Sequence, residues 1–163
     1  VIAALKRDGI RPAVVSGDRQ EPVQRLAGEL GIDEIYAECS PEDKAALVAK
    51  ARGTGLAFVG GGLNDAPALS GADVGIAIGT GTDLARESGH VVLLGDDLSR
   101  IPEVISLARF TYRIIRQNLL ASFGYNTIAL VLACMGFVHP LIAALAMLAS
   151  SLCVISNSLR IGR

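Results

Sequence analysis

The sequence predicts an α/β unit built on a parallel sheet, followed by two apolar helices that cross a membrane. Two observations predict this arrangement. Over residues 1–97, short apolar runs alternate with charged helical segments, a pattern typical of a parallel sheet covered by helices. Between Arg116 and Arg160, in contrast, the sequence contains no Asp, Glu, Lys or Arg.

The predicted elements of the sheet unit are short and closely spaced. Gly9 and Gly31 close the first two helices, because glycine readily adopts the backbone conformation that ends a helix. Ser40 and Pro41, followed by two acids, form a strong start for the third. Helices are expected at residues 1–8, 21–30, 41–52 and 83–87, with a short one ending at Leu69. Strands are expected at 12–15, 35–37, 56–59, 74–78 and 91–94.

An amphipathic connecting helix is predicted at residues 98–118, and two transmembrane helices at 119–138 and 141–159. Each apolar segment has about 20 residues, enough at a rise of 1.5 Å to cross a hydrocarbon core of about 30 Å. The alternative is a buried hairpin of a large soluble protein, but so long an uncharged stretch is hard to keep in water. We therefore expect an integral, multi-pass protein with the lipid bilayer as a partner.

Arginines flank the apolar pair on both sides. By the positive-inside rule they place the sheet unit, the tail at 160–163 and both chain ends in the cytoplasm, and a plasma (inner) membrane is expected. They lie at Arg109, Arg113 and Arg116 before the pair and at Arg160 and Arg163 after it.

The composition of the sequence argues against several other classes of protein. A net charge of -1 gives no signal for nucleic acid, which is normally bound by a basic patch. The three cysteines are widely spaced with no C-x-x-C, so neither a disulfide framework nor a zinc site is indicated. Because the first methionine is Met135, the sequence is expected to be a fragment of a longer protein.

Three places in the sheet unit carry polar residues where an open parallel sheet presents its binding crevice. They are Ser16-Gly17-Asp18 after a strand, Lys44 just inside a helix, and the glycine-rich segment at 60–65 after another strand. A glycine-rich turn into a helix exposes N–H groups that can hold a phosphate oxygen, and a lysine adds positive charge. A carboxylate beside such a phosphate indicates Mg²⁺, which prefers oxygen ligands. Each signal alone is weak, because such residues more often form a plain turn or a solvated surface.

The order of these motifs resembles the phosphorylation domain of P-type ATPases, which belongs with the haloacid-dehalogenase-like phosphotransferases. The matching segments are S-G-D, S-P-E-D-K, G-G-G-L-N-D-A-P-A-L and A-D-V-G-I-A-I-G-T-G-T-D. With the apolar pair, the resemblance covers essentially the whole chain and implies a partial Rossmann-type sheet domain. The implied phosphoryl environment comprises Ser16, Gly17, Asp18, Lys44 and Asn64, with Gly60 and Gly62 in the cofactor-binding turn. Asp65 would help to organise Mg²⁺, whereas Thr80, Gly81 and Asp83 would form a structural turn.

Two departures from the family pattern bear on activity. The family has G-D-G-x-N-D, but Gly61 stands where the first Asp, a direct Mg²⁺ ligand, is expected. Loss of that ligand is expected to slow phosphoryl transfer on the order of a thousandfold. The phosphorylated Asp of D-K-T-G-T is absent too, as are the nucleotide-binding insertion and the central strand that this missing upstream part supplies. We expect Mg²⁺ and ATP to act in the intact pump, and this chain alone to be inactive and prone to aggregate.

Polar residues within the apolar pair suggest a transported metal. Met147 lies three and four residues before Ser150 and Ser151, on one helical face, and a thioether suits Cu(I). The alternative is ordinary packing, since methionine fills gaps and polar side chains hold membrane helices together. With Tyr125-Asn126, these residues resemble the signature of the Cu(I)-exporting subgroup, which completes its sites with an upstream Cys-Pro-Cys.

The remaining metal-binding residue types are assigned structural roles. Cys153 is expected to pack, His139 to lie in the loop and His90 at a strand edge. Two rival functions stay open: a non-catalytic, membrane-anchored remnant of such a pump that binds or regulates, and a membrane-tethered dinucleotide-binding reductase. The second is disfavoured because the G-x-G-x-x-G spacing is not met after Val59.

Overall fold

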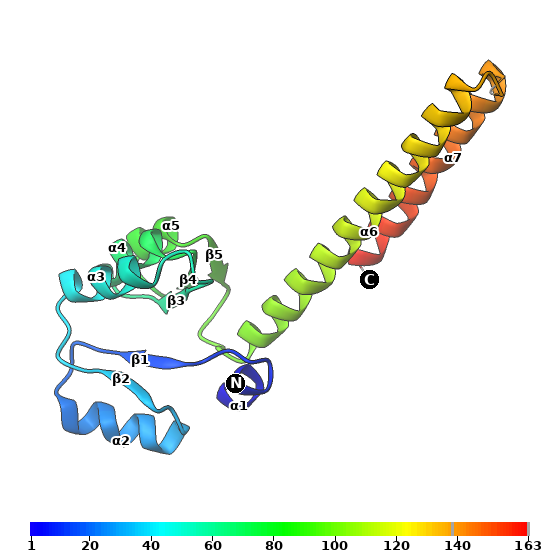
Figure 1. Cartoon of the computed structure of the whole chain (residues 1–163). Coiled ribbons are helices and arrows are strands. Elements are labelled where there is room, and N and C mark those ends of the chain that lie inside the picture. Colours follow the sequence, from blue (N-terminus) through cyan, green and yellow to red (C-terminus); the bar gives the residue numbers. More distant parts are fainter. Residues whose placement is uncertain (138, 163) are drawn as a thin grey trace. The chain divides into compact units, whose positions relative to one another are not determined.

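The computed structural model of the protein describes residues 1–137 and 139–162. It divides into two compact units, Val1–Pro102 and Glu103–Arg163. All of the described strands lie in the first unit, and most of two long helices lies in the second (Figure 1).

The strands of the first unit are all paired in parallel, as predicted. They form two sheets instead of one: β1 pairs with β2, and β3, β4 and β5 pair in that order. Among the described residues, β1 and β3 therefore each keep one edge that no strand pairs. Their bounds are β1 Ala13–Val15, β2 Glu34–Tyr36, β3 Ala57–Gly60, β4 Val74–Ile78 and β5 Val91–Leu93.

The helices of this unit begin and end where local chemistry dictates. Gly31 ends α2 in the left-handed conformation, with φ of 67°. At the start of α3 the Ser40 hydroxyl accepts the Asp43 N–H at 3.1 Å, and the Asp43 carboxylate accepts the Ser40 N–H at 2.9 Å. These bonds to Ser40 lower the pKa of Asp43. The helices are α1 Ile2–Arg7, α2 Gln20–Leu30, α3 Pro41–Ala51, η1 Leu63–Asp65, α4 Ala66–Gly71 and α5 Asp83–Ser88.

The core of the first unit lies between the three-stranded sheet and helices α3, α4 and α5. Leu69 and Ala77 are fully buried in one cluster, Val48 and its neighbours form a second, and Phe58 packs against both. In contrast, no residue of β1 or β2 is buried. Apolar side chains are therefore packed more closely around β4 than around the two-stranded sheet.

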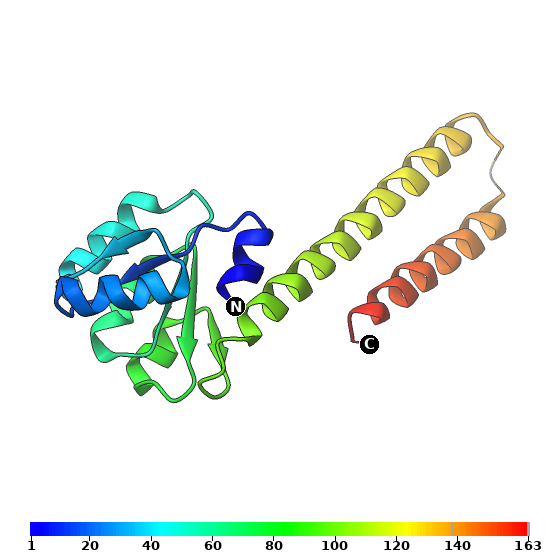
Figure 2. The same cartoon turned by 90° about the horizontal axis from the view of Figure 1, so that it is seen from below.

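The second unit is a helical hairpin. Helix α6 (Arg100–Cys134) is continuous through the predicted connecting helix and most of the first predicted span, and α7 (Pro140–Ser158) follows, ending in η2 (Leu159–Gly162). Both views show α6 and α7 side by side and antiparallel (Figures 1 and 2). The first span was predicted to end at Val138, which lies outside the described residues.

One helix of the described part of the chain, Leu141–Ile161, is long and apolar enough to cross a membrane, with a mean hydropathy of 1.8. It corresponds to the second predicted span. Ser122, Asn126 and Thr127 make the apolar part of α6 more polar, and a transmembrane role for α6 stays a prediction.

Candidate functional site

The loop after β1 is held against the segment between β2 and α3. The Ser16 hydroxyl donates to the Asp18 carboxylate at 2.9 Å, and the Asp18 N–H donates back to the Ser16 oxygen at 3.2 Å. The carbonyls of Asp18 and Ser16 accept the N–H groups of Glu38 and Cys39 at 2.9 and 3.0 Å. A Cβ on Gly17 would lie 3.3 Å from the Cys39 carbonyl oxygen, so a small residue suits this close approach.

Lys44 reaches the glycine-rich turn that follows β3. Its Nζ donates to Oδ1 of Asp65 at 2.8 Å, and the two side chains are only 15% and 16% exposed. The other carboxylate oxygen of Asp65 accepts the Gly62 N–H at 3.0 Å. The sequence predicted Lys44 and Asp65 in one site, but it did not predict that they pair directly.

The glycines of this turn are required by the Asp65 carboxylate that folds back over it. A Cβ on Gly60 would lie 2.9 Å from Asp65 Oδ2, and one on Gly62 would lie 3.1 Å from it. Gly61 differs, because its Cβ would instead meet Ile78 Cβ at 3.3 Å. A Cβ at this position therefore needs Ile78 to give by only a few tenths of an ångström.

The turn after β4 packs on the backbone of Gly61. The Thr82 N–H donates to the Gly61 carbonyl at 3.0 Å, and the Thr80 hydroxyl donates to Asp96. Thr82 also begins α5 by accepting the Ala85 N–H at 3.3 Å. These bonds are structural, in keeping with the turn predicted for Thr80, Gly81 and Asp83. A cavity of about 320 Å³ beside the turn is lined by Gly61, Ile78, Thr80, Gly81, Asp96 and Leu98.

The residues present do not by themselves fit Mg²⁺. Both carboxylate oxygens of Asp65 are engaged, one by Lys44 and one by the Gly62 N–H. Gly61 offers no ligand, and among the described residues no group of three or more His, Cys, Asp or Glu side chains could hold a metal ion. A complete magnesium site therefore needs ligands from outside the described part of the chain.

The structure brings the predicted phosphoryl residues together only in part. Ser16 and Asp18 contact Glu38 and Cys39 in the loop before α3, and Lys44 of α3 contacts Asp65. Asn64 is exposed beside Asp65 in η1. Convergence of Ser16, Lys44 and Asn64 on one phosphate stays a prediction.

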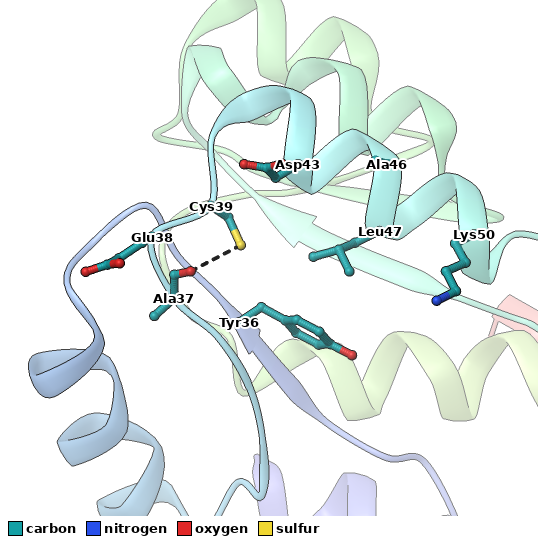
Figure 3. Close-up of a pocket in the computed structure, with 8 residues that line it drawn as sticks. All are labelled: Tyr36, Ala37, Glu38, Cys39, Asp43, Ala46, Leu47 and Lys50. Carbon is teal, nitrogen blue, oxygen red and sulfur yellow. Dashed lines mark hydrogen bonds between the residues drawn. The ribbon is translucent and has the colours of Figure 1, made fainter.

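A second cavity, of about 430 Å³, opens between the end of β2 and α3 (Figure 3). In Figure 3 the Tyr36 ring lies near Leu47, and the dashed line marks Cys39 Sγ donating to the Ala37 carbonyl at 3.6 Å. Cys39 is a single thiol with a structural contact, so nothing marks this cavity as a catalytic site. Its lining residues are Tyr36, Ala37, Glu38, Cys39, Asp43, Ala46, Leu47 and Lys50.

The residues predicted to bind the transported metal lie on two faces of the hairpin. Tyr125 and Ser150 are half-buried. Asn126, Met147 and Ser151 are exposed, Met147 by 69%, and the Ser151 hydroxyl donates to the Met147 carbonyl at 3.0 Å. Within this unit, therefore, Met147 is open to a partner other than α6.

Two groups of polar contacts were not predicted from the sequence. Asp73 accepts the N–H groups of Gly53, Gly55 and Leu56 at 2.9–3.0 Å, tying the turn before β3 to the start of β4. Near the open end of the hairpin, Asn118 and Asn157 hydrogen-bond at 2.8 Å. The sequence did contain one signal for the Asn118–Asn157 contact. The two asparagines lie at similar numbers of residues before and after the turn of the hairpin.

Comparison with known protein families first indicates the class of the sheet unit. Residues 1–73 match the model of haloacid dehalogenase-like hydrolases, a class in keeping with parallel strands whose carboxyl ends carry the Ser16, Lys44 and Asp65 segments.

Matches that cover nearly the whole chain identify a particular family within this class. A copper-exporting P-type ATPase of Staphylococcus aureus is 46% identical over 98% of the chain, and cation-transporting P-type ATPase B of Mycobacterium bovis is 44% identical over 98%. The crystal structure of a zinc-transporting PIB-type ATPase superposes with a TM-score of 0.95 at 38% identity, covering 99% of the chain. The chain belongs to the heavy-metal P-type ATPases. It spans about a fifth of the curated relatives' length, 20% and 22%, and 27% of the solved structure.

Proposed function

We propose that the chain is part of an ATP-driven, multi-pass membrane pump that exports a soft metal ion, with Cu(I) as the cargo. The observation that carries this proposal is the Lys44–Asp65 pair at the glycine turn, 2.8 Å long, in the same chain as the uncharged apolar stretch at 117–159. The first resembles the phosphate-handling part of a pump and the second its membrane part. The flanking arginines place the sheet unit and both ends in the cytoplasm.

Cu(I) is favoured over Zn²⁺ by the ligand types in the hairpin. Met147 offers a thioether, which is a soft ligand, and the sequence between Arg116 and Arg160 contains no carboxylate. The missing carboxylates disfavour hard cations, whereas Cys134 and Cys153 of the same stretch are ligand types that both Cu(I) and Zn²⁺ accept. Zn²⁺ remains the second candidate, because a zinc-transporting PIB-type ATPase superposes on 99% of the chain.

The split sheet supports a role for an upstream segment of the pump. The unpaired edges of β1 and β3 border the two loops that carry the predicted phosphoryl residues. A strand that carries the phosphorylated Asp and pairs with both edges would join the sheets and place its carboxylate beside those loops. Mg²⁺ and ATP would then act in the whole pump, and the chain alone would show no Mg²⁺-dependent ATP hydrolysis.

A non-catalytic, membrane-anchored remnant of such a pump is the second candidate function, and Gly61 favours it. Glycine there removes the carboxylate that the family uses for Mg²⁺ and leaves only Asp65, whose oxygens are both engaged. This candidate predicts normal folding and membrane insertion of the longer protein, with no metal-stimulated ATP hydrolysis.

Substitution of Met147 tests the cargo. In the longer protein, Met147→Leu is expected to lower Cu(I) affinity by at least about tenfold, the lower bound for loss of even an outer-shell metal partner. Met135→Leu is the matched control, because Met135, the only other methionine of the sequence, lies in the turn after α6. Cu(I) titration of purified protein measures both. Equal Cu(I) affinity in the two variants would remove Met147 from the site, and Zn²⁺ binding that exceeds Cu(I) binding would favour the second cargo.

A further inference from the structure

Four polar side chains tie α6 to α7 near the open end of the hairpin. Nδ2 of Asn157 donates to Oδ1 of Asn118 at 2.8 Å and to Oε1 of Gln117 at 3.4 Å. Nδ2 of Asn118 donates to the Ser158 hydroxyl at 2.9 Å, and Arg160 donates to Oδ1 of Asn157 at 3.3 Å. Asn118 and Asn157 thus each donate and accept, so each fixes the other's orientation.

The less exposed residues of each helix continue from this cluster as one stripe toward the turn. On α6 the half-buried positions recur every three or four residues, as helical periodicity requires for one face. On α7 the same spacing holds, while the large apolar side chains face outward. The stripe consists of Asn118, Ser122, Tyr125 and Ala129 on α6, and of Ala146, Ser150, Val154, Asn157 and Ser158 on α7.

Two of the predicted metal-binding residues lie at the same number of residues from this polar cluster, one on each helix. Tyr125 and Ser150 each lie seven residues from Asn118 and Asn157, in the direction of the turn. At 1.5 Å per residue both lie about 10 Å from the amide pair. A hairpin held by Asn118 and Asn157 therefore brings Tyr125 level with Ser150.

We propose that Gln117, Asn118, Asn157 and Ser158 form an amide clamp that fixes the register of α6 against α7 and so positions Tyr125 beside Ser150. Most residues of the stripe are small, whereas amide hydrogen bonds are directional and so favour one register of the two helices. Asn118 and Asn157 are thus positioning residues of the metal site, an inference that rests on the proposed function. The register itself does not depend on the identity of the cargo.

Disulfide cross-linking tests the register directly. In the full chain in lipid vesicles, with the three native cysteines replaced by Ala, Ser122→Cys/Val154→Cys is the in-register pair and Ser122→Cys/Ser150→Cys lies one turn off. Asn157→Leu is expected to lower the ratio of the in-register yield to the off-register yield by about threefold. This is the change in equilibrium that corresponds to losing one hydrogen bond of average strength between membrane helices. Ser156→Leu, an adjacent exposed position, serves as the control and should change neither yield. Unchanged yields with Asn157→Leu would overturn the clamp.

Metal affinity tests the positioning role. In the longer protein, Asn157→Leu is expected to weaken Cu(I) binding about threefold while Ser156→Leu leaves it unchanged. A shifted register with unchanged Cu(I) affinity would overturn the positioning role. If the unaltered longer protein binds no Cu(I), the cargo proposal and the positioning role both fail, while the cross-link yields still decide whether the clamp exists.

Discussion

The sheet unit and the hairpin place their large apolar side chains in opposite ways. In the sheet unit Leu69 is fully buried and Ala68, Ala77 and Ala85 have no exposed surface. Along the hairpin most large apolar side chains stand outward, with Phe123 exposed by 70% and Met147 by 69%, although Ile114 in the first half of α6 is only 1% exposed. Two polar side chains of the hairpin, Asn118 and Asn157, are in contrast partly buried between α6 and α7.

This contrast supports the proposal that the two units face different solvents. A water-soluble unit hides apolar surface because its exposure to water is costly. A membrane helix exposes apolar surface to lipid tails and hides the groups that need hydrogen bonds. Most large apolar side chains of the hairpin follow the second pattern, and by length and composition Leu141–Ile161 is the candidate span among the described residues.

The largest effect is expected from a charged residue placed on the hairpin, compared with the same charge placed on the sheet unit. Leu148→Lys on α7 should prevent insertion or cost about 2.5–3.5 kcal/mol, because a charge at the centre of a membrane helix is poorly solvated. Leu94→Lys after β5 is the matched control, since Leu94 and Leu148 are both exposed, by 78% and 60%. The fraction of protein that remains in alkaline-washed membranes measures the difference. Equal membrane retention of both variants would show that the hairpin does not face lipid.

The Lys44–Asp65 pair is expected to contribute a smaller amount to the sheet unit. Lys44→Met leaves the partly buried Asp65 carboxylate without its cation and should lower the free energy of unfolding by about 1–2 kcal/mol, since both groups retain some solvent. Lys50→Met, at an exposed position of the same helix, should have little effect. Urea unfolding of the full chain in detergent measures both. If the Lys44→Met/Asp65→Asn double variant is no more stable than the sum of the single changes predicts, the pair contributes nothing specific.

Asp73 gives the smallest effect and depends on pH. The N–H groups of Gly53, then of Leu56 and Gly55, lower the pKa of Asp73 below its ordinary 3.8. A carboxyl whose pKa is lower in the folded state stabilises the fold above 3.8, and this stabilisation is lost as pH falls through the folded pKa. The Tm advantage of the unaltered chain over Asp73→Asn should thus be present at pH 7 and shrink below pH 4. The exposed control Glu29→Gln should show no such trend, and a pH-independent advantage would exclude the charge of Asp73 as its cause.

Local rules predicted the elements of the sheet unit closely. The Ser40 cap, the Gly31 stop and the strand at 74–78 lie where their residues indicated, because each depends on neighbours in sequence. The pairing of strands into two sheets was not predicted as such, since it depends on which strand lies beside which. Residue 138 lies outside the described part of the chain, and α6 ends at Cys134, where Gly136 with φ of 76° turns the backbone.

The candidate site was predicted as a set of residues and not as a set of contacts. Lys44, Gly60, Gly62 and Asp65 do meet, but sequence spacing does not show that Lys44 takes an oxygen of Asp65. The Asn118–Asn157 contact was missed because it joins residues far apart in the sequence, and each amide alone looks like ordinary helix packing.

Restoring a carboxylate at position 61 tests most directly whether this chain is part of a phosphoryl-transferring pump. In the longer protein, Gly61→Asp should raise Mg²⁺-dependent, Cu(I)-stimulated ATP hydrolysis on the order of a thousandfold. Gly61→Ala meets the same contact with Ile78 without adding a ligand and should leave the rate unchanged. Equal rates for the Gly61, Gly61→Ala and Gly61→Asp proteins would contradict the account.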